Sequence, residues 1–439
     1  MNDYNLNKSE IIKAMNKKGF KTQNELADEL NITKNQLSVM LSPKFNPIKS
    51  NVIRLCNKLD ISVEDILSND NNNQITFFDK NNISNSEQSR SNNLDEEFLD
   101  ITNIIAKKTY TCVELFAGAG GLALGLESAG FESVGLVELD KNACTTLNHN
   151  RPNWNVIQED IITVAEKGIR NYIGNVEVDL LSGGYPCQSF SYAGKRLGLN
   201  DVRGTMFYYY AKILEELKPK AFLAENVKGL ITDDEGRTLK TMLNVFTDLG
   251  YKVKYKLLNA LDYGVSQKRE RVVIIGIRND IDIEYKYPKK FDYKPNLRDA
   301  LEGVPLSDGS KYPDKKKAVL DLVPPGGCWV DLPEDVAKEY MGKSYFSGGG
   351  KRGMARRISW DEPCLTLTCS PAQKQTERCH PDETRPFTVR EYARIQSFPD
   401  DWEFPVSVSA SYKQIGNAVP CKLAKAVGLS LADVLNRID

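Results

Sequence analysis

The stretch YTCVELFAGAGGLALGLESA, residues 110–129, joins an apolar run, a glycine-rich turn and an amphipathic segment. It predicts a strand at 110–116 and a helix at 122–129. The alternation continues, with further strands predicted at 132–139, 154–160, 178–181, 221–227 and 271–277 and helices at 205–217 and 239–249. Near-continuous apolar strands separated by helices are typical of a sheet covered on both faces. The sequence therefore predicts an α/β fold with a Rossmann-like, doubly wound sheet that binds ligands at the carboxyl ends of its strands.

The residues that follow these strands suggest a nucleoside-like ligand. The glycine turn at 116–121 lets a ligand approach the backbone, but alone it also fits a dinucleotide enzyme or simple helix packing. Glu138 ends the next predicted strand, where it could bind ribose hydroxyls, and Asp160 ends the strand WNVIQED, where it could bind an adenine amino group. Without a phosphate-binding fingerprint, this set suits S-adenosylmethionine. The alternative is that both acids are solvated strand ends.

The turn GGYPCQSFS at 183–191 displays a thiol, Cys187, just after a predicted strand. The ordinary alternative for one of nine cysteines is a small buried hydrophobe. Glu225, in the segment ENV, ends the neighbouring predicted strand. A thiolate that attacks C6 of a cytosine needs negative charge relieved at N3, and a carboxylic acid can donate that proton. We therefore predict that Cys187 and Glu225 act on one base, whose C5 then takes a methyl group from a sulfonium.

From about Thr109 onward the chain resembles the DNA cytosine-C5 methyltransferase family of restriction-modification type. Six motifs occur in the family's order: FAGAGG at 116–121, GGYPCQSFS at 183–191, AENV at 224–227, QKRER at 267–271, TVRE with RIQSFP at 388–399, and QIGNAVP at 414–420. The resemblance implies methyl transfer from S-adenosylmethionine to a cytosine flipped out of a specific duplex sequence, through a covalent bond from cysteine to C6. Two residues depart from the pattern: Glu114 where Asp is usual, and Leu139 where an aromatic ring often stacks on adenine.

The resemblance also implies roles for individual residues. Catalysis would fall to Cys187 as nucleophile, to Pro186 that positions it, to Glu225 as the partner of N3, and to Gln267, Arg269 and Arg271 of the QxRxR motif. Its arginines would hold the catalytic loop and the base, with Arg271 nearest the cytosine. Cofactor contacts are implied for Phe116, Gly118, Gly120, Gly121, Glu138, Leu139, Asp160, Ile161, Pro186, Met206, Asn417, Ala418 and Val419. DNA contacts are implied for Ser191 and Arg203.

Two further segments gain meaning from the resemblance. The segment KRLGLNDVRGT at 195–205 is expected to be a mobile loop that closes on the flipped base, although a polar, glycine-containing loop is usually a solvated connection. Between residues 278 and 385 glycine, proline and basic residues become frequent. In this expected target-recognition domain, the loop at 347–353, Arg356, Arg357 and QKQ at 373–375 could enter the major groove. For any one of these residues, contact with phosphates is the commoner alternative.

The first 67 residues have helix-turn-helix spacing, with predicted helices around 22–30 and at 34–41 joined by the turn NIT. The segment resembles the helix-turn-helix domains of phage-type repressors. Lys34, Asn35, Gln36 and Ser38, at the start of the second helix, would contact DNA. We expect this domain to bind and repress its own promoter, and it could form a dimer; the alternative is that it helps the enzyme engage its substrate DNA.

Bulk properties complete the expectations. No apolar run is long enough to span a bilayer and no signal peptide is evident, so we expect a cytoplasmic protein. Nine cysteines without paired spacing and only two histidines predict free thiols and no metal site. The net charge of −1 gives no global sign of nucleic-acid binding. The expected domains are a helix-turn-helix domain at 1–67, a disordered linker at 68–107, a catalytic domain at 108–280, a target-recognition domain at 281–385 and a return to the catalytic domain at 386–439.

Two other functions stay open. An RNA cytosine methyltransferase could use the same fold, and a DNA-binding regulator could carry an inert catalytic domain, although the intact Cys187, Glu225 and QxRxR set argues against the latter. We expect the catalytic part to be a monomer. The recognition sequence and any partner nuclease do not follow from the sequence.

Overall fold

A computed structural model describes residues 98–186, 202, 204–346 and 353–438, with residues 5–6, 15, 17–20, 22, 25–26 and 67–68 nearer the amino terminus. Its contacts divide the chain into two units, residues 1–87 and 88–439, and each is considered by itself. In the first unit, β1 (Asn5–Leu6) pairs antiparallel with β2 (Leu67–Ser68). The predicted DNA contacts Lys34, Asn35, Gln36 and Ser38 lie outside the described residues.

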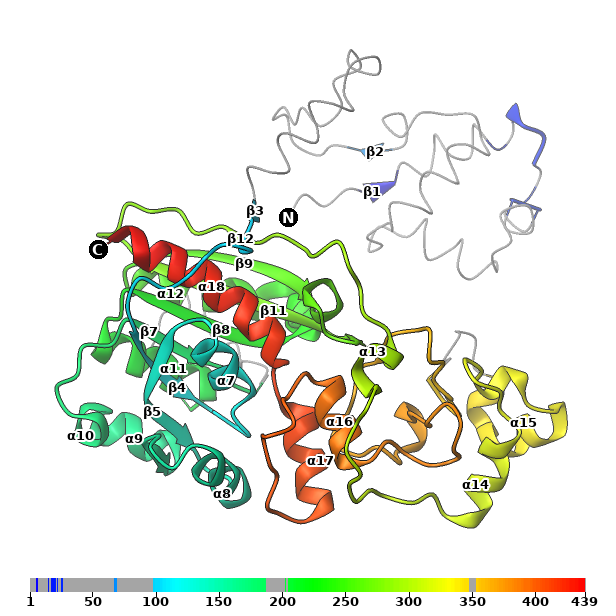
Figure 1. Cartoon of the computed structure of the whole chain (residues 1–439). Helices are drawn as coiled ribbons and strands as arrows, with labels where there is room; N and C mark the ends of the chain where they lie inside the picture. The colour runs from blue at the N-terminus through cyan, green and yellow to red at the C-terminus, as the bar shows by residue number, and fades with distance from the viewer. Residues whose placement is uncertain are drawn as a thin grey trace. The chain divides into compact units, whose positions relative to one another are not determined.

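The second unit is built on a seven-stranded sheet with the strand order β6-β5-β4-β7-β8-β11-β9 (Figure 1). The first five strands in this order are parallel, while β11 runs antiparallel to both of its neighbours. The strands are β4 (Tyr110–Leu115), β5 (Phe131–Glu138), β6 (Val156–Gln158), β7 (Leu180–Gly183), β8 (Ala221–Val227), β9 (Tyr251–Asn259) and β11 (Glu270–Arg278). The predicted α/β fold with a Rossmann-like sheet is confirmed.

Helices cover both faces of this sheet, because neighbouring strand residues point to opposite sides. Cys112, Leu180 and Leu223 pack with helices α7 and α18, whereas Val113, Leu181 and Phe222 pack with α9, α11 and α12. The helices are α7 (Gly121–Glu127), α8 (Lys141–Asn150), α9 (Ile161–Lys167), α10 (Arg170–Ile173), α11 (Met206–Leu217), α12 (Arg237–Asp248) and α18 (Cys421–Ile438).

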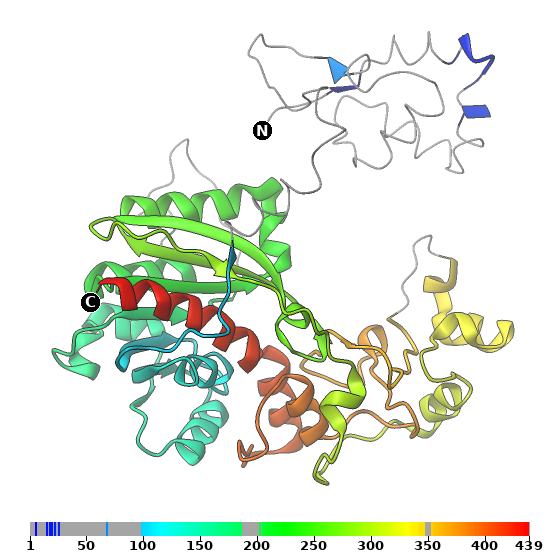
Figure 2. The ribbon, with the colours of Figure 1, turned by 45° about the horizontal axis from the view of Figure 1, so that its top comes forward.

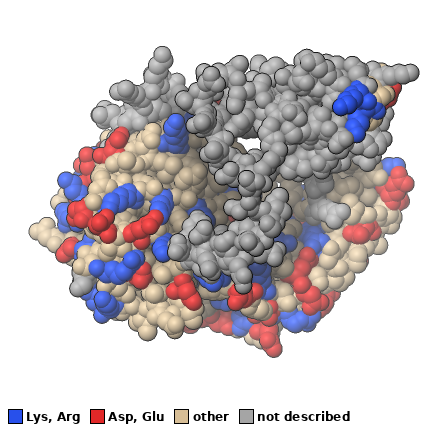
Figure 3. All heavy atoms as spheres, turned by 90° about the horizontal axis from the view of Figure 1, so that it is seen from above, with Lys and Arg blue, Asp and Glu red and all other residues tan. Residues whose placement is uncertain are grey.

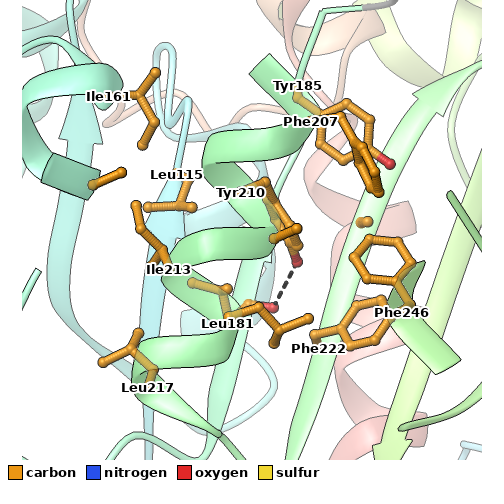
Figure 4. Packing of buried hydrophobic residues seen from close by; sticks show 14 of the residues in the cluster. Leu115, Ile161, Leu181, Tyr185, Phe207, Tyr210, Ile213, Leu217, Phe222 and Phe246 are labelled. Atoms are coloured by element: carbon orange, nitrogen blue, oxygen red, sulfur yellow. Dashed lines mark hydrogen bonds between the residues drawn. The ribbon is translucent and has the colours of Figure 1, made fainter. Parts of the chain in front are cut away.

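An aromatic cluster fills one of these two cores directly behind the predicted nucleophile turn (Figure 4). The Tyr210 hydroxyl donates to the carbonyl oxygens of Leu181 (3.2 Å) and Leu223 (3.0 Å), so it ties α11 to β7 and β8. The Tyr185 ring lies edge-on to Tyr210 and Phe207, with ring centroids 5.4 and 5.6 Å away. Because Tyr185 precedes Pro186 and Cys187, this packing anchors the start of the turn that carries the thiol.

Residues 98–107 belong to the packed unit, which corrects the predicted linker of residues 68–107. Strand β3 (Phe98–Leu99) pairs in parallel with β12 (Tyr287–Pro288), and Ile101 is buried in the core beneath α18. Asn436 of α18 accepts from the Lys107 amide (2.8 Å) and donates to the Ile105 carbonyl (2.9 Å). The prediction followed the polar composition of residues 68–107 and did not weigh the few apolar residues, such as Ile101, that pack on the core.

The remaining elements lie beside the sheet (Figure 2), and their buried side chains form a smaller core and a second core that connects it to the sheet. Tyr312, Leu320, Val323, Leu332 and Cys379 pack together in the smaller core. Ile281 and Tyr285 pack instead with α18, so the predicted boundary at 281 falls inside the larger core. The elements are β10 (Gln267–Lys268), α13 (Leu297–Leu301), α14 (Asp314–Asp321), α15 (Glu334–Met341), β13 (Cys364–Leu365), α16 (Val389–Ile395) and α17 (Val408–Asn417). The described part of the unit also contains short 3-10 turns, among them η2 (Lys228–Ile231), η3 (Asp233–Gly236), η4 (Ala260–Tyr263), η5 (Trp329–Asp331), η6 (Gly342–Phe346) and η7 (Lys374–Thr376).

The surface carries charges of both signs. On the face seen in Figure 3, lysine and arginine side chains are interspersed with aspartate and glutamate over the described atoms, in keeping with a net charge of −1. None of the described helices is long and apolar enough to cross a membrane. Within the described part of the chain, no group of three or more His, Cys, Asp and Glu side chains is placed to hold a metal ion.

Candidate active site

A cavity of about 440 Å³ opens where the parallel strands end at their carboxyl edge. Strands β4, β5, β7 and β8 contribute residues at or just after their carboxyl ends, and the segment at the end of α17 completes the lining. The lining residues are Glu114, Phe116, Ala117, Gly118, Gly121, Leu122, Glu138, Asp140, Ala143, Gly184, Tyr185, Pro186, Glu225, Asn226, Val227, Arg269, Arg271, Lys413, Gln414, Gly416, Asn417, Ala418 and Val419. The sheet therefore brings residues more than 300 positions apart in the sequence to one site.

The glycine turn after β4 has backbone angles that favour glycine. Gly118 and Gly120 have φ values of 54° and 83°, in the left-handed region that most side chains avoid. At Gly121, a Cβ atom would collide with the Val419 carbonyl oxygen. The turn thus packs directly against the segment after α17, and both segments line the cavity.

Glu138 is oriented by backbone donors on both sides. Its Oε2 accepts from the Gly118 amide and its Oε1 from the Asp140 amide, each at 2.7 Å. The carboxylate is therefore held at the cavity wall with further lone pairs available. This geometry is suited to a pair of vicinal hydroxyl groups.

Other predicted cofactor residues do not line this cavity. Asp160 accepts from the Ile162 amide (2.8 Å) as the N-cap of α9, Ile161 and Met206 pack with the core beneath the sheet, and Leu139 is 64% exposed. The predicted cofactor contacts of Leu139, Asp160, Ile161 and Met206 stay predictions. Gly120 also does not line the cavity and packs near Leu147 and Trp402.

Glu225 and Arg271 form an ion pair on the opposite wall. Arg271 Nε lies 2.6 Å from Glu225 Oε1, and the two side chains are only 11% and 13% exposed. Burial raises the pKa of Glu225, against the opposing effects of Arg271 and Arg269. Gly184 faces the other carboxyl oxygen, because a Cβ there would lie 2.7 Å from Glu225 Oε2. The glycine before Tyr185 thus leaves room for the acid.

The predicted nucleophile, Cys187, comes directly after three residues that line the cavity, Gly184 to Pro186. Pro186 lines the cavity, whereas Cys187, Ser191, Arg203 and most of the predicted mobile loop at 195–205 lie outside the described residues. Thr205 is described and accepts from the Tyr208 amide (3.2 Å) as the N-cap of α11. The loop therefore leads directly into a capped helix.

Arg269 and Gln267 are buried connectors. Arg269 donates to the carbonyl oxygens of Leu367 (3.0 Å) and Gly416 (2.7 Å), and burial lowers its pKa to about 9. Gln267 is fully buried and donates to Gln396 Oε1 (2.7 Å). Arg269 thus reaches the cavity and ties β10 to two other segments, a role that the motif alone did not suggest.

Arg356 and Arg357, two residues suggested to enter the major groove, make their hydrogen bonds within the protein. Arg357 is 4% exposed and donates to four carbonyl oxygens and to the Thr384 hydroxyl. Arg356 donates to both carboxyl oxygens of Glu362 and to the carbonyls of Gly326 and Gly327. Both side chains are thus held by internal bonds, which the basic composition of this region does not reveal. The loop residues 347–352 lie outside the described residues.

Sequence reasoning missed Glu114 as a site residue. Its side chain is 1% exposed, and its Oε2 has no hydrogen-bond partner among the described residues. Burial, followed by the charge of Glu138, holds its pKa well above the usual value. The signal was present, since Glu114 is the acid inside the otherwise apolar run of β4. Lys413 and Asp140, which pair at 2.7 Å on the cavity rim, left no such signal.

A family model for C-5 cytosine-specific DNA methylases matches residues 110–433, more than half of the chain. The chain belongs to this family. The methylase is an enzyme that acts on DNA and takes its methyl group from S-adenosylmethionine, the donor of C5 DNA methyltransferases. A second model, the bacteriophage CI repressor helix-turn-helix domain, matches residues 10–74, so the methylase also carries a DNA-binding domain at its amino-terminal end.

Individual relatives agree with the family assignment. Type II methyltransferase M.Sau96I of Staphylococcus aureus is 58% identical over 438 residues, 99% of this chain and 100% of that protein. Type II methyltransferase M.Eco47II of Escherichia coli is 54% identical over 381 residues, 84% of this chain and 89% of that protein. Among solved structures, a prophage-encoded E. coli protein described as a DNA modification methyltransferase has a TM-score of 0.56 at 26% identity, covering 74% of this chain and 99% of that one.

Proposed function

We propose that this methylase transfers a methyl group to C5 of one cytosine in a specific duplex sequence, through a covalent intermediate on a flipped base. The buried Glu225–Arg271 pair carries the proposal. It shares a cavity with Pro186, the neighbour of Cys187, on one wall and with Glu138 on the other. A proton donor, a nucleophile and a nucleoside-binding acid are thereby expected around one space.

The cavity lining fits S-adenosylmethionine. This cofactor carries an ammonium group and two ribose hydroxyls, and the cavity offers the unpartnered Glu114 Oε2 and the oriented Glu138 carboxylate. Phe116, Gly118, Asn417, Ala418 and Val419 would complete the site with backbone and apolar contacts. When bound, the cofactor supplies an electrophilic methyl group on a sulfonium.

The protein side of the reaction follows from the raised pKa of Glu225. The Cys187 thiolate adds to C6, the C5–C6 double-bond electrons shift to form a C4–C5 double bond, and the C4–N3 pair takes a proton from Glu225 at N3. Return of that proton to Glu225 makes C5 nucleophilic, and C5 would take the methyl group as its bond to the sulfonium sulfur breaks and a neutral thioether leaves. Loss of the C5 proton to a base then restores the double bond as the bond from Sγ to C6 breaks. Arg271 holds the Glu225 carboxyl in place and would contact the same base.

Trapping tests the covalent step. Fluorine at C5 cannot leave as a proton, so duplex DNA with 5-fluorocytosine at the target should hold the enzyme in a covalent adduct that survives denaturing electrophoresis. Cys187→Ala should form no adduct. Cys328→Ala is a matched control because Cys328 is a free thiol outside both the predicted turn and the cavity lining. Adduct formation by Cys187→Ala would refute the assignment of the nucleophile.

Substrate class is tested with labelled cofactor. We expect label from S-adenosylmethionine in duplex DNA, and label confined to transfer RNA would overturn the DNA proposal. Bisulfite sequencing of DNA from cells that express the protein would give the target base and its recognition sequence in one experiment. The Cys187→Ala variant, expressed in parallel, separates this activity from that of the host.

The type II relatives suggest the biological role. We propose that the methylase protects host DNA within a restriction-modification system and works in the cytoplasm, where bacterial DNA lies. A genome that expresses the methylase should resist a nuclease specific for the sequence that bisulfite mapping reveals. DNA from cells with the Cys187→Ala variant should be cut.

The amino-terminal domain suggests self-regulation. We propose that it binds the upstream region of its own gene, by Lys34, Asn35, Gln36 and Ser38 and as a dimer, and represses transcription. Removal of residues 1–70 should abolish binding of this region in a gel-shift assay and should spare methylation. If methylation is lost instead, the domain serves engagement of the substrate.

We also propose a division of labour along the chain. Residues 1–67 form the regulatory domain, the larger core of the second unit holds the catalytic site, and the region around the smaller core, within residues 281–385, selects the target. Residues 386–439 return to the catalytic part. Support comes from the separate clusters of buried residues in the second unit.

A further inference from the structure

Gln396 follows α16 and is fully buried without lining the cavity. Its Nε2 donates to the carbonyl oxygens of Ile415 (2.8 Å) and Ala418 (3.0 Å), at the end of α17. The last carbonyls of a helix lack the usual donor four residues on. The Ile415 carbonyl also accepts from the Ala418 amide (3.2 Å), and the Gln396 amide adds a donor there and another to the Ala418 carbonyl, on the other side of Asn417. Asn417 and Ala418 line the cavity.

A second glutamine holds Gln396 in this orientation. Gln267 Nε2 donates to Gln396 Oε1 (2.7 Å), and Gln267 Oε1 accepts from the Leu367 amide (2.8 Å). Both side chains are fully buried. In each glutamine the amide nitrogen donates and the amide oxygen accepts. If either amide rotated by 180°, a buried donor or acceptor would lose its partner.

The other end of this chain of bonds reaches the cavity segment again. Arg269 donates to Leu367 and Gly416 carbonyl oxygens, and Cys369 Sγ donates to Asn417 Oδ1 (2.8 Å). Gly416 packs so tightly on this segment that a Cβ would lie 2.5 Å from the Thr368 carbonyl. The segment 364–369 and the turn 415–419 are thus joined by the two buried bonds of Arg269 and by the bond from Cys369 to Asn417.

We propose that Gln396, held by Gln267, is a positioning residue that sets the turn 415–419 for cofactor binding. It acts through Asn417 and Ala418 and touches neither cofactor nor base. The inference rests on the proposed cofactor site. Loss of the Gln396 amide removes a donor from the Ile415 and Ala418 carbonyls and loosens the turn, so affinity for S-adenosylmethionine falls while the chemistry at Glu225 is untouched.

The test compares full-length variants. Gln396→Met has a similar volume and no hydrogen bonds; we expect its Kd for S-adenosylmethionine, from calorimetry without DNA, to rise about tenfold. At saturating cofactor, kcat for methylation of duplex DNA should stay within about threefold. Gln267→Met should weaken binding in the same direction. The double variant should lose less than the product of the two single losses, since both act on one chain of bonds.

A control separates positioning from general stability. Tyr251 lies on β9 outside the cavity lining, and its buried hydroxyl donates to the Pro219 carbonyl (3.0 Å). Tyr251→Phe should therefore lower the melting temperature without changing the cofactor Kd. If Gln396→Met folds poorly, Gln396→Asn keeps a polar group and should show the same rise in Kd. A wild-type Kd in both Gln396 variants would overturn the inference. Failure of the wild-type enzyme to bind the cofactor would instead overturn the proposed function.

Discussion

Two opposing influences act on Glu225. Burial favours its neutral form, whereas Arg271 at 2.6 Å favours its charged form, and the result is a raised pKa. Such a balance suits a carboxyl that gives and takes one proton. It also depends on Gly184, whose missing side chain leaves space for Oε2.

Glu225→Gln should lower kcat for methylation by about a hundredfold or more, because the amide has no proton to give to N3. Single-turnover rates with duplex DNA measure the change, and cofactor affinity should stay near the wild-type value. Since proton donation needs neutral Glu225, the rate should also fall as pH rises through its raised pKa. A variant within twofold of the wild-type rate would contradict the role.

Glu114 predicts a pH dependence of stability. Its pKa lies well above the usual 4.5 in the folded protein, so the folded state binds more protons than the unfolded state. Its contribution to stability is therefore present below pH 4.5 and is lost as pH rises through the native pKa. Glu114→Gln should be more stable than wild type at pH 8, by about 1–3 kcal/mol.

Thermal unfolding of both proteins at pH 5 and pH 8 measures this effect. The difference between variant and wild type should be larger at pH 8, and the comparison cancels groups such as Glu225 that titrate in both proteins. Glu114→Gln should also weaken cofactor binding, because it removes the charge proposed to face the ammonium group. An equal difference at both pH values would show that the pKa of Glu114 is the same in the folded and unfolded states.

At the scale of elements, the packing of α7 on α18 depends on a small residue. A Cβ at Gly125 would lie 2.5 Å from the Cys421 carbonyl oxygen and still closer to the Ala424 side chain. Glycine inside a helix otherwise lowers its stability relative to alanine by roughly 0.5–1 kcal/mol. Close helix contact therefore outweighs propensity at this position.

Gly125→Ala should destabilise the protein by about 1–2 kcal/mol, because overpacking exceeds the gain in helix propensity. The melting temperature measures the loss. Gly229→Ala is the matched control: a Cβ there meets only Val227 Cγ2 at 4.0 Å, so it should be close to neutral. A stabilised Gly125→Ala protein would mean that the two helices can move apart freely.

At the scale of the whole molecule, the packed part of the second unit begins before β4, the first strand along the chain of the seven-stranded sheet. Residues 98–107 cover the core beneath α18 and bond to Asn436. Lys256 Nζ lies 3.8 Å from the Phe98 ring centroid, which adds a cation–π contact from β9. This segment is therefore part of the fold that supports the active site.

A protein that begins at residue 98 should fold and methylate DNA, whereas one that begins at residue 109 should melt several degrees lower. The shorter protein exposes the sites of Phe98, Leu99 and Ile101 on the core. It also removes the bonds of the Asn436 side chain to Lys107 and Ile105 and leaves it with the Tyr110 hydroxyl. Melting curves and methylation assays of the two proteins check this. Equal melting temperatures would show that the segment contributes nothing to stability.

Much of this architecture could be predicted from local pattern. The apolar runs at β4, β7, β8 and β11 are buried on both faces, so their sequence shows them directly. Strand β9 escaped prediction because it lies at the sheet edge, where Lys252 and Lys254 alternate with apolar residues. Its identity depends on pairing with β11, which no local pattern shows.

The sequence by itself determined the fold class, the family and the proposed reacting residues Glu225 and Cys187, because chemistry at strand ends leaves short motifs. Only the tertiary structure decided which polar groups meet. Burial and bonds across more than ten residues decide whether Arg357 contacts DNA or supports the core. They also decide whether Gln396 supports the cofactor turn. These contacts form when distant segments pack, so no pattern along the chain encodes them visibly.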